Sequence, residues 1–217
     1  MLRGRSVEEY PASDYQFTEN WFMGVKPIWD DLFGKISPRR ILEVGSFEGA
    51  SICYVIDKLG RSGPLEIHCI DTWEGGVEHQ TQGYDMSAVE TRFDHNVAKA
   101  ISRCPNPVDF KKHKGSSEIH LSRLIATGRR SSFDLVYIDG SHQAPDVLVD
   151  AVLGFSLLRP GGVMVFDDYT WFEQLPQGKD PLRCPKLAID AFVNVNFRKI
   201  EIINSFLYQL YLIKTQD

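Results

Sequence analysis

The 217-residue sequence predicts an α/β fold, with an open and mostly parallel β-sheet in one main domain. Apolar segments of strand length alternate with helical patterns through most of the chain, which is typical of β-α-β units. Several of these segments are almost continuously apolar, as expected for strands that helices cover on both faces. Two β-rich segments close the chain and predict one reversed strand.

The parallel strands are expected at 40–44, 65–70, 108–112, 133–138 and 162–166, and the terminal pair at 199–203 and 206–213. Only Asn204 and Ser205 separate the terminal pair, and so short a connection requires antiparallel pairing. The first 37 residues are rich in aromatic side chains. We expect them to form helices that lie over a sheet edge or reach toward a neighbour. The chain is therefore divided into an N-terminal helical segment, 1–37, and a main domain, 38–217.

Two helices carry start signals. Ser87 and Glu90 form a predicted capping box, in which each side chain bonds the backbone amide of the other. Pro145 fits a first helical turn, where a missing N–H costs little. It precedes an apolar stripe of Val147, Leu148, Ala151, Val152 and Phe155. The segment 160–162, Pro-Gly-Gly, is expected to end this helix and release the next strand, and a last helix is expected near 186–195.

The composition excludes several classes of protein. The formal net charge is −5, and Lys and Arg are spread along the chain, so nothing indicates nucleic-acid binding. No uncharged apolar segment reaches the roughly 18 residues of a membrane span, and the first residues lack the apolar region of a signal peptide. We therefore expect a cytoplasmic protein without a membrane partner. We assign no chemistry to the four cysteines, which form no C-x-x-C pair.

The segment ILEVGSFEGAS, 41–51, is the strongest local motif. It places Gly45 and Gly49 at a strand-to-helix turn, where a ligand can approach the backbone beyond the end of the strand. The middle glycine of the dinucleotide pattern G-x-G-x-x-G is absent and Phe47 lies in the turn, which disfavours a pyrophosphate. Asp71 follows the next strand, where an acid can accept hydrogen bonds from a ribose diol. Together these residues predict a nucleoside site.

A second group of polar residues follows two later strands. Asp139 ends FDLVYID, and Asp167 and Asp168 end GVMVFDD. If these strands are adjacent and parallel, the three carboxyl groups meet at one sheet edge and repel one another unless a cation compensates their charge. Mg²⁺ is the economical choice because it prefers carboxylate and water oxygens. The alternative is that one Asp binds metal or cofactor while the others cap turns or pair with Lys or Arg.

His142 lies three residues after Asp139, and an imidazole there could accept a proton from a hydroxyl near neutral pH. Its alternative role is to support the metal site or to cap the next helix. His68 and His113 are interpreted as ordinary strand residues.

In four motifs, ILEVGSFEGAS, IDTWEGG, FDLVYIDGSH and LLRPGGVMVFDDY, the sequence resembles class I S-adenosylmethionine (SAM)-dependent methyltransferases. More narrowly, it is similar to the macrocin-type and cephalosporin-pathway O-methyltransferases. The resemblance implies a Rossmann-like sheet of seven strands in the order 3-2-1-4-5-7-6, with the last strand antiparallel. It implies Mg²⁺ bound by Asp139, Asp167 and Asp168, with Asp139 and His142 as catalytic residues. It also implies that SAM contacts Glu43, Gly45, Ser46, Phe47, Gly49, Ser51, Asp71, Thr72, Trp73, Ser116, Ser117 and Asp139.

Some of these roles keep an alternative. Trp73 either closes over the cofactor or lies in the core, and Ser116 and Ser117 either contact adenine or cap the following helix. Gly140-Ser141 replaces the aromatic or His residues that follow the first acid in catechol methyltransferases, which argues against a catechol substrate.

The predicted reaction is methyl transfer from SAM to the hydroxyl of a small molecule, with 169–185 as a loop over this acceptor. Two other functions remain open, a metal-independent N- or O-methyltransferase and a SAM- or nucleoside-binding protein without turnover. The missing G-x-G-x-x-G disfavours a nicotinamide-dependent oxidoreductase. The aromatic residues of the N-terminal segment suggest a homo-oligomer.

Overall fold

The computed structural model describes residues 14–77, 83–206 and 208–217. They form a seven-stranded sheet in the order β3-β2-β1-β4-β5-β7-β6. Strands β1 to β5 pair in parallel, and β7 runs antiparallel to both β5 and β6, so the predicted fold class and strand order are confirmed. The strands are β1 (Arg40–Val44), β2 (Leu65–Asp71), β3 (Val108–Lys114), β4 (Phe133–Ile138), β5 (Leu158–Phe166), β6 (Ile200–Ile203) and β7 (Leu210–Lys214).

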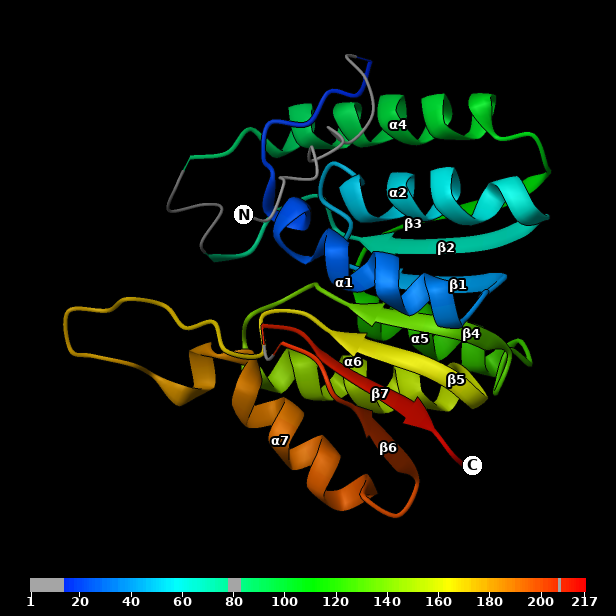
Figure 1. Cartoon of the computed structure of the whole chain (residues 1–217). Coiled ribbons are helices and arrows are strands. Elements are labelled where there is room, and N and C mark those ends of the chain that lie inside the picture. The colour runs from blue at the N-terminus through cyan, green and yellow to red at the C-terminus, as the bar shows by residue number, and fades with distance from the viewer. Residues whose placement is uncertain (1–13, 78–82, 207) are drawn as a thin grey trace, which may run out of the picture.

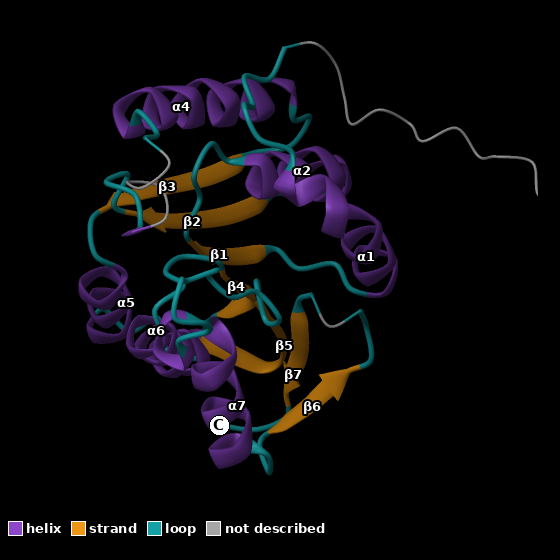
Figure 2. Cartoon of the chain, turned by 90° about the vertical axis from the view of Figure 1, so that its left-hand side faces the viewer, coloured by secondary structure: helices purple, strands orange, loops and turns teal. Residues whose placement is uncertain are grey.

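Helices cover both faces of this sheet, as Figures 1 and 2 show. α1, α2 and α4 share one buried apolar cluster with the sheet, and α5, α6 and α7 share a second one on the opposite face. None of the helices in the described ranges is long and apolar enough to span a membrane. The helices are α1 (Trp21–Lys35), α2 (Ala50–Leu59), α4 (Met86–Arg103), α5 (Ser117–Ala126), α6 (Ala144–Leu157) and α7 (Pro185–Asn196), with short 3-10 turns at Gly60–Ser62 and Pro181–Arg183.

The two clusters explain why the strands are so apolar. Successive side chains of a strand point to opposite faces, so Ile41 contributes to the first cluster and its neighbour Leu42 to the second. All residues of β4, at the centre of the sheet, are buried. A strand covered on both faces cannot alternate apolar with polar residues.

The N-terminal helix α1 lies against α2 and buries Trp29 and Phe33. The indole Nε1 of Trp29 donates a 3.0 Å hydrogen bond to Oε1 of Gln209, just before β7. Residues 1–13 of the predicted N-terminal segment lie outside the described residues.

The predicted capping box at the start of α4 is wrong. The helix begins at Met86, and Oδ1 of Asp85 accepts hydrogen bonds from the amides of Ser87 and Ala88, at 3.1 and 3.2 Å. Glu90 instead forms ion pairs with lysines of β3. Asp caps a helix as well as Ser does, and its carboxylate adds a favourable interaction with the helix dipole.

Two predicted connections also differ from the structure. α6 ends at Leu157 and β5 begins at Leu158, so the Pro-Gly-Gly segment lies within the strand, beside a register shift against β4. Proline is tolerated in a strand at such an irregularity. The terminal pair is antiparallel as predicted, but β6 ends at Ile203 and β7 begins at Leu210, so the two-residue connection is wrong.

The apolar stripe of α6 is narrower than predicted. Val147 and Ala151 are buried, whereas Leu148 and Val152 are 37% and 50% exposed.

Candidate functional site

A large cavity lies where β1, β2, β4 and β5 end, and its volume is about 820 Å³. Its walls come from the turns that follow β1 to β5 and from the N-terminal part of α1. In an open α/β sheet, this edge is where ligands bind. The volume is in the range of sites for small molecules and cofactors.

The turn after β1 approaches the end of β4 very closely. Gly45 has a φ of +82°, and a Cβ on this residue would lie 1.9 Å from the backbone oxygen of Asp139. Oδ2 of Asp71 accepts hydrogen bonds from the amides of Ser46 and Phe47, at 2.8 and 3.0 Å. Asp71 therefore fixes the conformation of the glycine turn. The predicted cofactor residues that line the cavity are Gly45, Ser46, Phe47, Ser51, Asp71, Thr72, Ser116, Ser117 and Asp139.

Three other predicted cofactor residues, Glu43, Gly49 and Trp73, do not line the cavity. Glu43 is 1% exposed and accepts hydrogen bonds from the hydroxyls of Ser46 and Ser51. Burial raises the pKa of Glu43 to about 7. Through these two hydroxyls, the buried carboxyl group of Glu43 holds the glycine turn from its core side.

Gly49 precedes α2 with a φ of +80°, and a Cβ there would lie 3.0 Å from the ring of Phe93. The ring of Trp73 also packs on Phe93, and its Nε1 donates a 3.0 Å hydrogen bond to the backbone oxygen of Phe47. Trp73 is 3% exposed, so the structure places it in the core, the second of its two predicted alternatives.

Asp150 of α6 lines the cavity, and sequence reasoning missed it. It is 2% exposed, and its Oδ1 has no hydrogen-bond partner among the described residues. Burial raises the pKa of Asp150 to about 7. The available signal was an acid three residues after Val147, on the buried stripe of the predicted helix.

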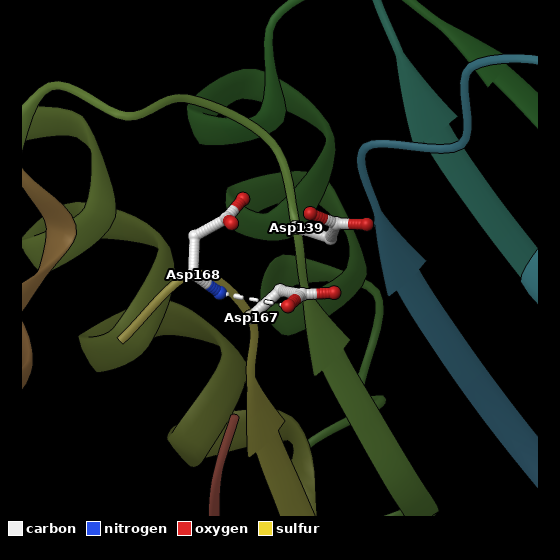
Figure 3. Close-up of side chains that lie close together, drawn as sticks. All are labelled: Asp139, Asp167 and Asp168. Atoms are coloured by element: carbon white, nitrogen blue, oxygen red, sulfur yellow. Dashed lines mark hydrogen bonds between the residues drawn. The ribbon is translucent and has the colours of Figure 1, made fainter. Parts of the chain in front are cut away.

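Asp139, Asp167 and Asp168 meet at the ends of β4 and β5, as Figure 3 shows. The two strands are adjacent and parallel, with Ile138 opposite Phe166, which brings the residues that follow them together. Each acid offers one carboxylate oxygen, and the three oxygens lie within 4.8 Å of one another. Three convergent carboxylate oxygens are a donor set that suits a hard divalent cation.

The pKa values of these acids agree with the close spacing of their carboxyl groups. Burial and the neighbouring carboxylates of Asp167 and Asp168 raise the pKa of Asp139 well above its usual range. Burial and the charge of Asp168 raise the pKa of Asp167 to about 6. In the described part of the chain, no Lys or Arg pairs with any of the three acids. The Lys or Arg pairing of the predicted alternative is therefore absent here, whereas its turn-capping part is present, because Oδ1 of Asp167 accepts a 2.7 Å hydrogen bond from the amide of Asp168.

Neutral side chains orient these acids, and sequence reasoning missed them. The Tyr137 hydroxyl lies 2.9 Å from Oδ2 of Asp139 and also contacts Oδ2 of Asp167, and its single proton is donated to one of the two. The Tyr208 hydroxyl donates to Oδ1 of Asp168 at 2.8 Å. Tyr137 could have been found, because it lies two residues before Asp139 and carries the one polar group of the segment LVYI in β4. Tyr208 lies near the end of the chain, and no local sequence signal marks it.

His142 lies beside the acids. Its Nε2 is 2.8 Å from Oδ2 of Asp168, and its ring centroid is 4.1 Å from that of Trp171. His142 and Trp171 both line the cavity. Phe172, next to Trp171 in the loop after β5, does not line it and is 41% exposed. Figure 1 shows most of this loop extending away from the strand ends.

His68 and His113 lie on β2 and β3, as predicted, and neither lines the cavity. Nδ1 of His68 is 3.0 Å from Nε2 of His113.

The comparison with known families identifies the class of protein. A family model described as a methyltransferase domain matches residues 42–169, which include the glycine turn and all three acids. The chain belongs to this methyltransferase-domain family.

One curated relative is the probable caffeoyl-CoA O-methyltransferase 3 of Dictyostelium discoideum. It is 21% identical over 172 residues, which are 74% of this chain and 60% of the relative. The chain thus spans less than two thirds of the length of that relative.

Solved structures share the fold. The O-methyltransferase TomG from Streptomyces achromogenes, in complex with SAM, is 20% identical; the match covers 87% of this chain and 78% of TomG, with a TM-score of 0.59. The MycE methyltransferase from the mycinamycin biosynthetic pathway, in complex with Mg and SAH, is 22% identical; the match covers 91% of this chain and 51% of MycE, with a TM-score of 0.55.

Proposed function

We propose that the protein transfers the methyl group of SAM to a hydroxyl oxygen of a small molecule, with the help of a divalent cation bound by Asp139, Asp167 and Asp168. One observation carries this proposal. The three convergent carboxylate oxygens form part of the wall of the same cavity that the glycine turn opens. A cofactor on the turn and an acceptor on the cation would therefore be neighbours, and holding two reactants in this way supplies much of the rate of a transfer reaction.

The glycine turn and the residues near it would hold SAM, whose sulfonium supplies an activated methyl group. The missing side chain of Gly45 keeps the turn close to β4. Asp71 is held in place by three backbone amides, since its Oδ1 also accepts a 2.7 Å bond from Trp73, and it would accept the ribose hydroxyls. The SAM and SAH in the TomG and MycE structures support this assignment.

The three acids would hold the cation, which when bound would polarise the acceptor hydroxyl and lower its pKa. Tyr137 and Tyr208 hold the carboxylates in place. The Mg in the MycE complex supports the choice of a divalent ion.

His142 would accept the proton of the acceptor hydroxyl. Its Nε2 lies 2.8 Å from Oδ2 of Asp168, and this carboxylate would stabilise the imidazolium that forms when the ring takes up the proton. Trp171 packs on the imidazole ring and limits its movement.

Thermal unfolding in the presence of ligands tests the proposal. SAM and SAH are expected to raise the melting temperature of the wild-type protein, and NAD is not. Mg²⁺ is expected to raise it further for the wild type but not for Asp168→Asn. The control is Asp31→Asn on α1, which removes an exposed acid that does not line the cavity. Stabilisation by NAD alone would contradict the proposal, and an equal response of Asp168→Asn to Mg²⁺ would favour a metal-independent methyltransferase.

A further inference from the structure

The charged residues that line the cavity have one sign. Besides Asp71 and the three metal-site acids, it is lined by Glu19, Glu48, Glu118, Asp146 and Asp150, and by no Lys or Arg among the described residues. Glu48 forms a 2.5 Å ion pair with Arg92. Glu19, Glu118, Asp146 and Asp150 form no ion pair with Lys or Arg in the described ranges. Glu19 accepts a hydrogen bond from Tyr84, and Asp146 accepts one from Ser141.

Asp150 provides an independent sign that a ligand donates to this wall. Its carboxyl group is almost completely buried, and its Oδ1 has no partner in the described part of the chain. Buried carboxyl oxygens are nearly always satisfied in folded proteins. Asp150 borders Ser117, which is assigned to SAM, so the donor that this oxygen lacks would come from a ligand bound in that part of the cavity.

Part of the cavity wall is aromatic. Trp21 is 55% exposed, and its ring centroid lies 5.0 Å from that of Phe47, which in turn lies 5.7 Å from that of Tyr84. Aromatic faces favour flat rings and attract cations. The faces of these rings do not attract a phosphate or a carboxylate.

The basic residues of the loop after β5 do not add positive charge to the cavity wall. Lys179 lies over the ring of Phe172, 4.9 Å from its centroid, and Arg183 forms a 2.6 Å ion pair with Glu173. Neither Lys179 nor Arg183 lines the cavity.

We propose that the acceptor is a ring-bearing hydroxyl compound that is uncharged or carries a basic amine, and that the cavity rejects acceptors with phosphate or carboxylate groups. The inference rests on the proposed function. A divalent cation would be matched by the three acids that bind it, and SAM carries a single net positive charge. The remaining carboxylates would repel an anionic acceptor, such as a coenzyme A thioester or a nucleotide sugar.

Three phenols that differ only in side-chain charge test this inference. The probes are tyramine, 2-(4-hydroxyphenyl)ethanol and 4-hydroxyphenylacetate, each titrated into the full-length protein loaded with SAH and Mg²⁺ at pH 7.5. We expect the amine and the alcohol to bind at least tenfold more tightly than the acid. A ranking without a difference, or with the acid first, would overturn the inference.

Variants then locate the origin of the preference. Glu118→Gln combined with Asp146→Asn changes two exposed side chains that line the cavity, and we expect the ratio of tyramine affinity to acid affinity to fall at least threefold. Asp31→Asn removes an exposed charge from α1 and is expected to leave the ratio unchanged. An unchanged ratio in the double variant, or an equal fall in Asp31→Asn, would overturn the inference. SAH binding is measured first. A protein that does not bind SAH would contradict the proposed function. A protein that binds SAH but does not prefer the amine and the alcohol over the acid would contradict the charge preference alone.

Discussion

Gln209 donates a 2.8 Å hydrogen bond from its side-chain Nε2 to Oδ2 of Asp167. The Oε1 atom of the same side chain accepts hydrogen bonds from the indole of Trp29 and the hydroxyl of Tyr211. The amide is 1% exposed, and these two partners fix which end of it faces the acid. Through Gln209, the N-terminal helix α1 helps to orient one of the three clustered acids, Asp167.

Gln209→Met tests this relationship, because methionine keeps the volume but loses both the donor and the acceptor. We expect the affinity for Mg²⁺ to fall roughly 10- to 100-fold, as for other residues that orient metal ligands. The free energy of unfolding should also fall, by about 1–3 kcal/mol, because the buried indole N–H of Trp29 loses its acceptor. Calorimetric titration and urea unfolding measure the two effects. Gln216→Met, at an exposed position, is the control. Unchanged Mg²⁺ affinity would show that Gln209 does not act on the site.

Gly45→Ala should destroy the glycine turn. Gly45 and Gly128 have nearly the same φ, +82° and +85°, but only at Gly45 would a Cβ collide with a neighbouring strand. Gly128→Ala should therefore cost only the backbone strain, about 1–2 kcal/mol in the free energy of unfolding. Gly45→Ala should cost clearly more and abolish SAH binding. Equal losses in the two variants, with SAH binding intact in both, would argue against a tight turn at β1.

The buried Glu43 should make stability depend on pH. Its pKa is about 7 in the folded protein against an ordinary value of 4.5, so the folded state holds a proton that the unfolded state has released between these two values. The free energy of unfolding should therefore be highest below the unfolded pKa and fall by about 3 kcal/mol as pH rises from the unfolded pKa to the folded one, near 7. Glu43→Gln lacks this titration. Urea unfolding at pH 5 and pH 8 should show the variant gaining on the wild type at the higher pH, and a pH-independent difference would refute the assignment.

His142→Ala tests the proposed general base. We expect the rate of methyl transfer to fall roughly 10²- to 10⁴-fold, with little change in SAH affinity. His95→Ala, on an exposed part of α4, controls for the loss of a surface imidazole. A variant with the wild-type rate would remove His142 from the chemistry.

The sequence predicts the sheet well because its strands are covered on both faces. Apolar runs such as 133–138 can be recognised without knowledge of their neighbours, and the pairing of β4 with β5 then brings the acids together. The ends of elements are harder to predict, since Asp85 and Ser87 both suit the first turn of α4 and only the folded chain shows which of them caps it.

The position of Glu43 could have been inferred more closely. Side chains of a strand alternate, so Glu43 points to the same face as Ile41, toward α2, where Ser51 lies. The resemblance to methyltransferases placed it instead against the cofactor. Gln209 could not be found in this way, because its contacts depend on how α1 and β7 meet in the folded protein.

Transfer of an isotope-labelled methyl group from SAM to small molecules is the most direct test of cation-assisted O-methylation by this protein. The purified protein is incubated with labelled SAM and a mixture of hydroxyl compounds, with Mg²⁺ or with EDTA, and the products are identified by mass spectrometry. We expect label on a hydroxyl oxygen in the presence of Mg²⁺, its loss with EDTA and in Asp168→Asn, and its recovery when Mg²⁺ is restored to the wild type. Equal labelling with EDTA and in Asp168→Asn would contradict a role for the cation.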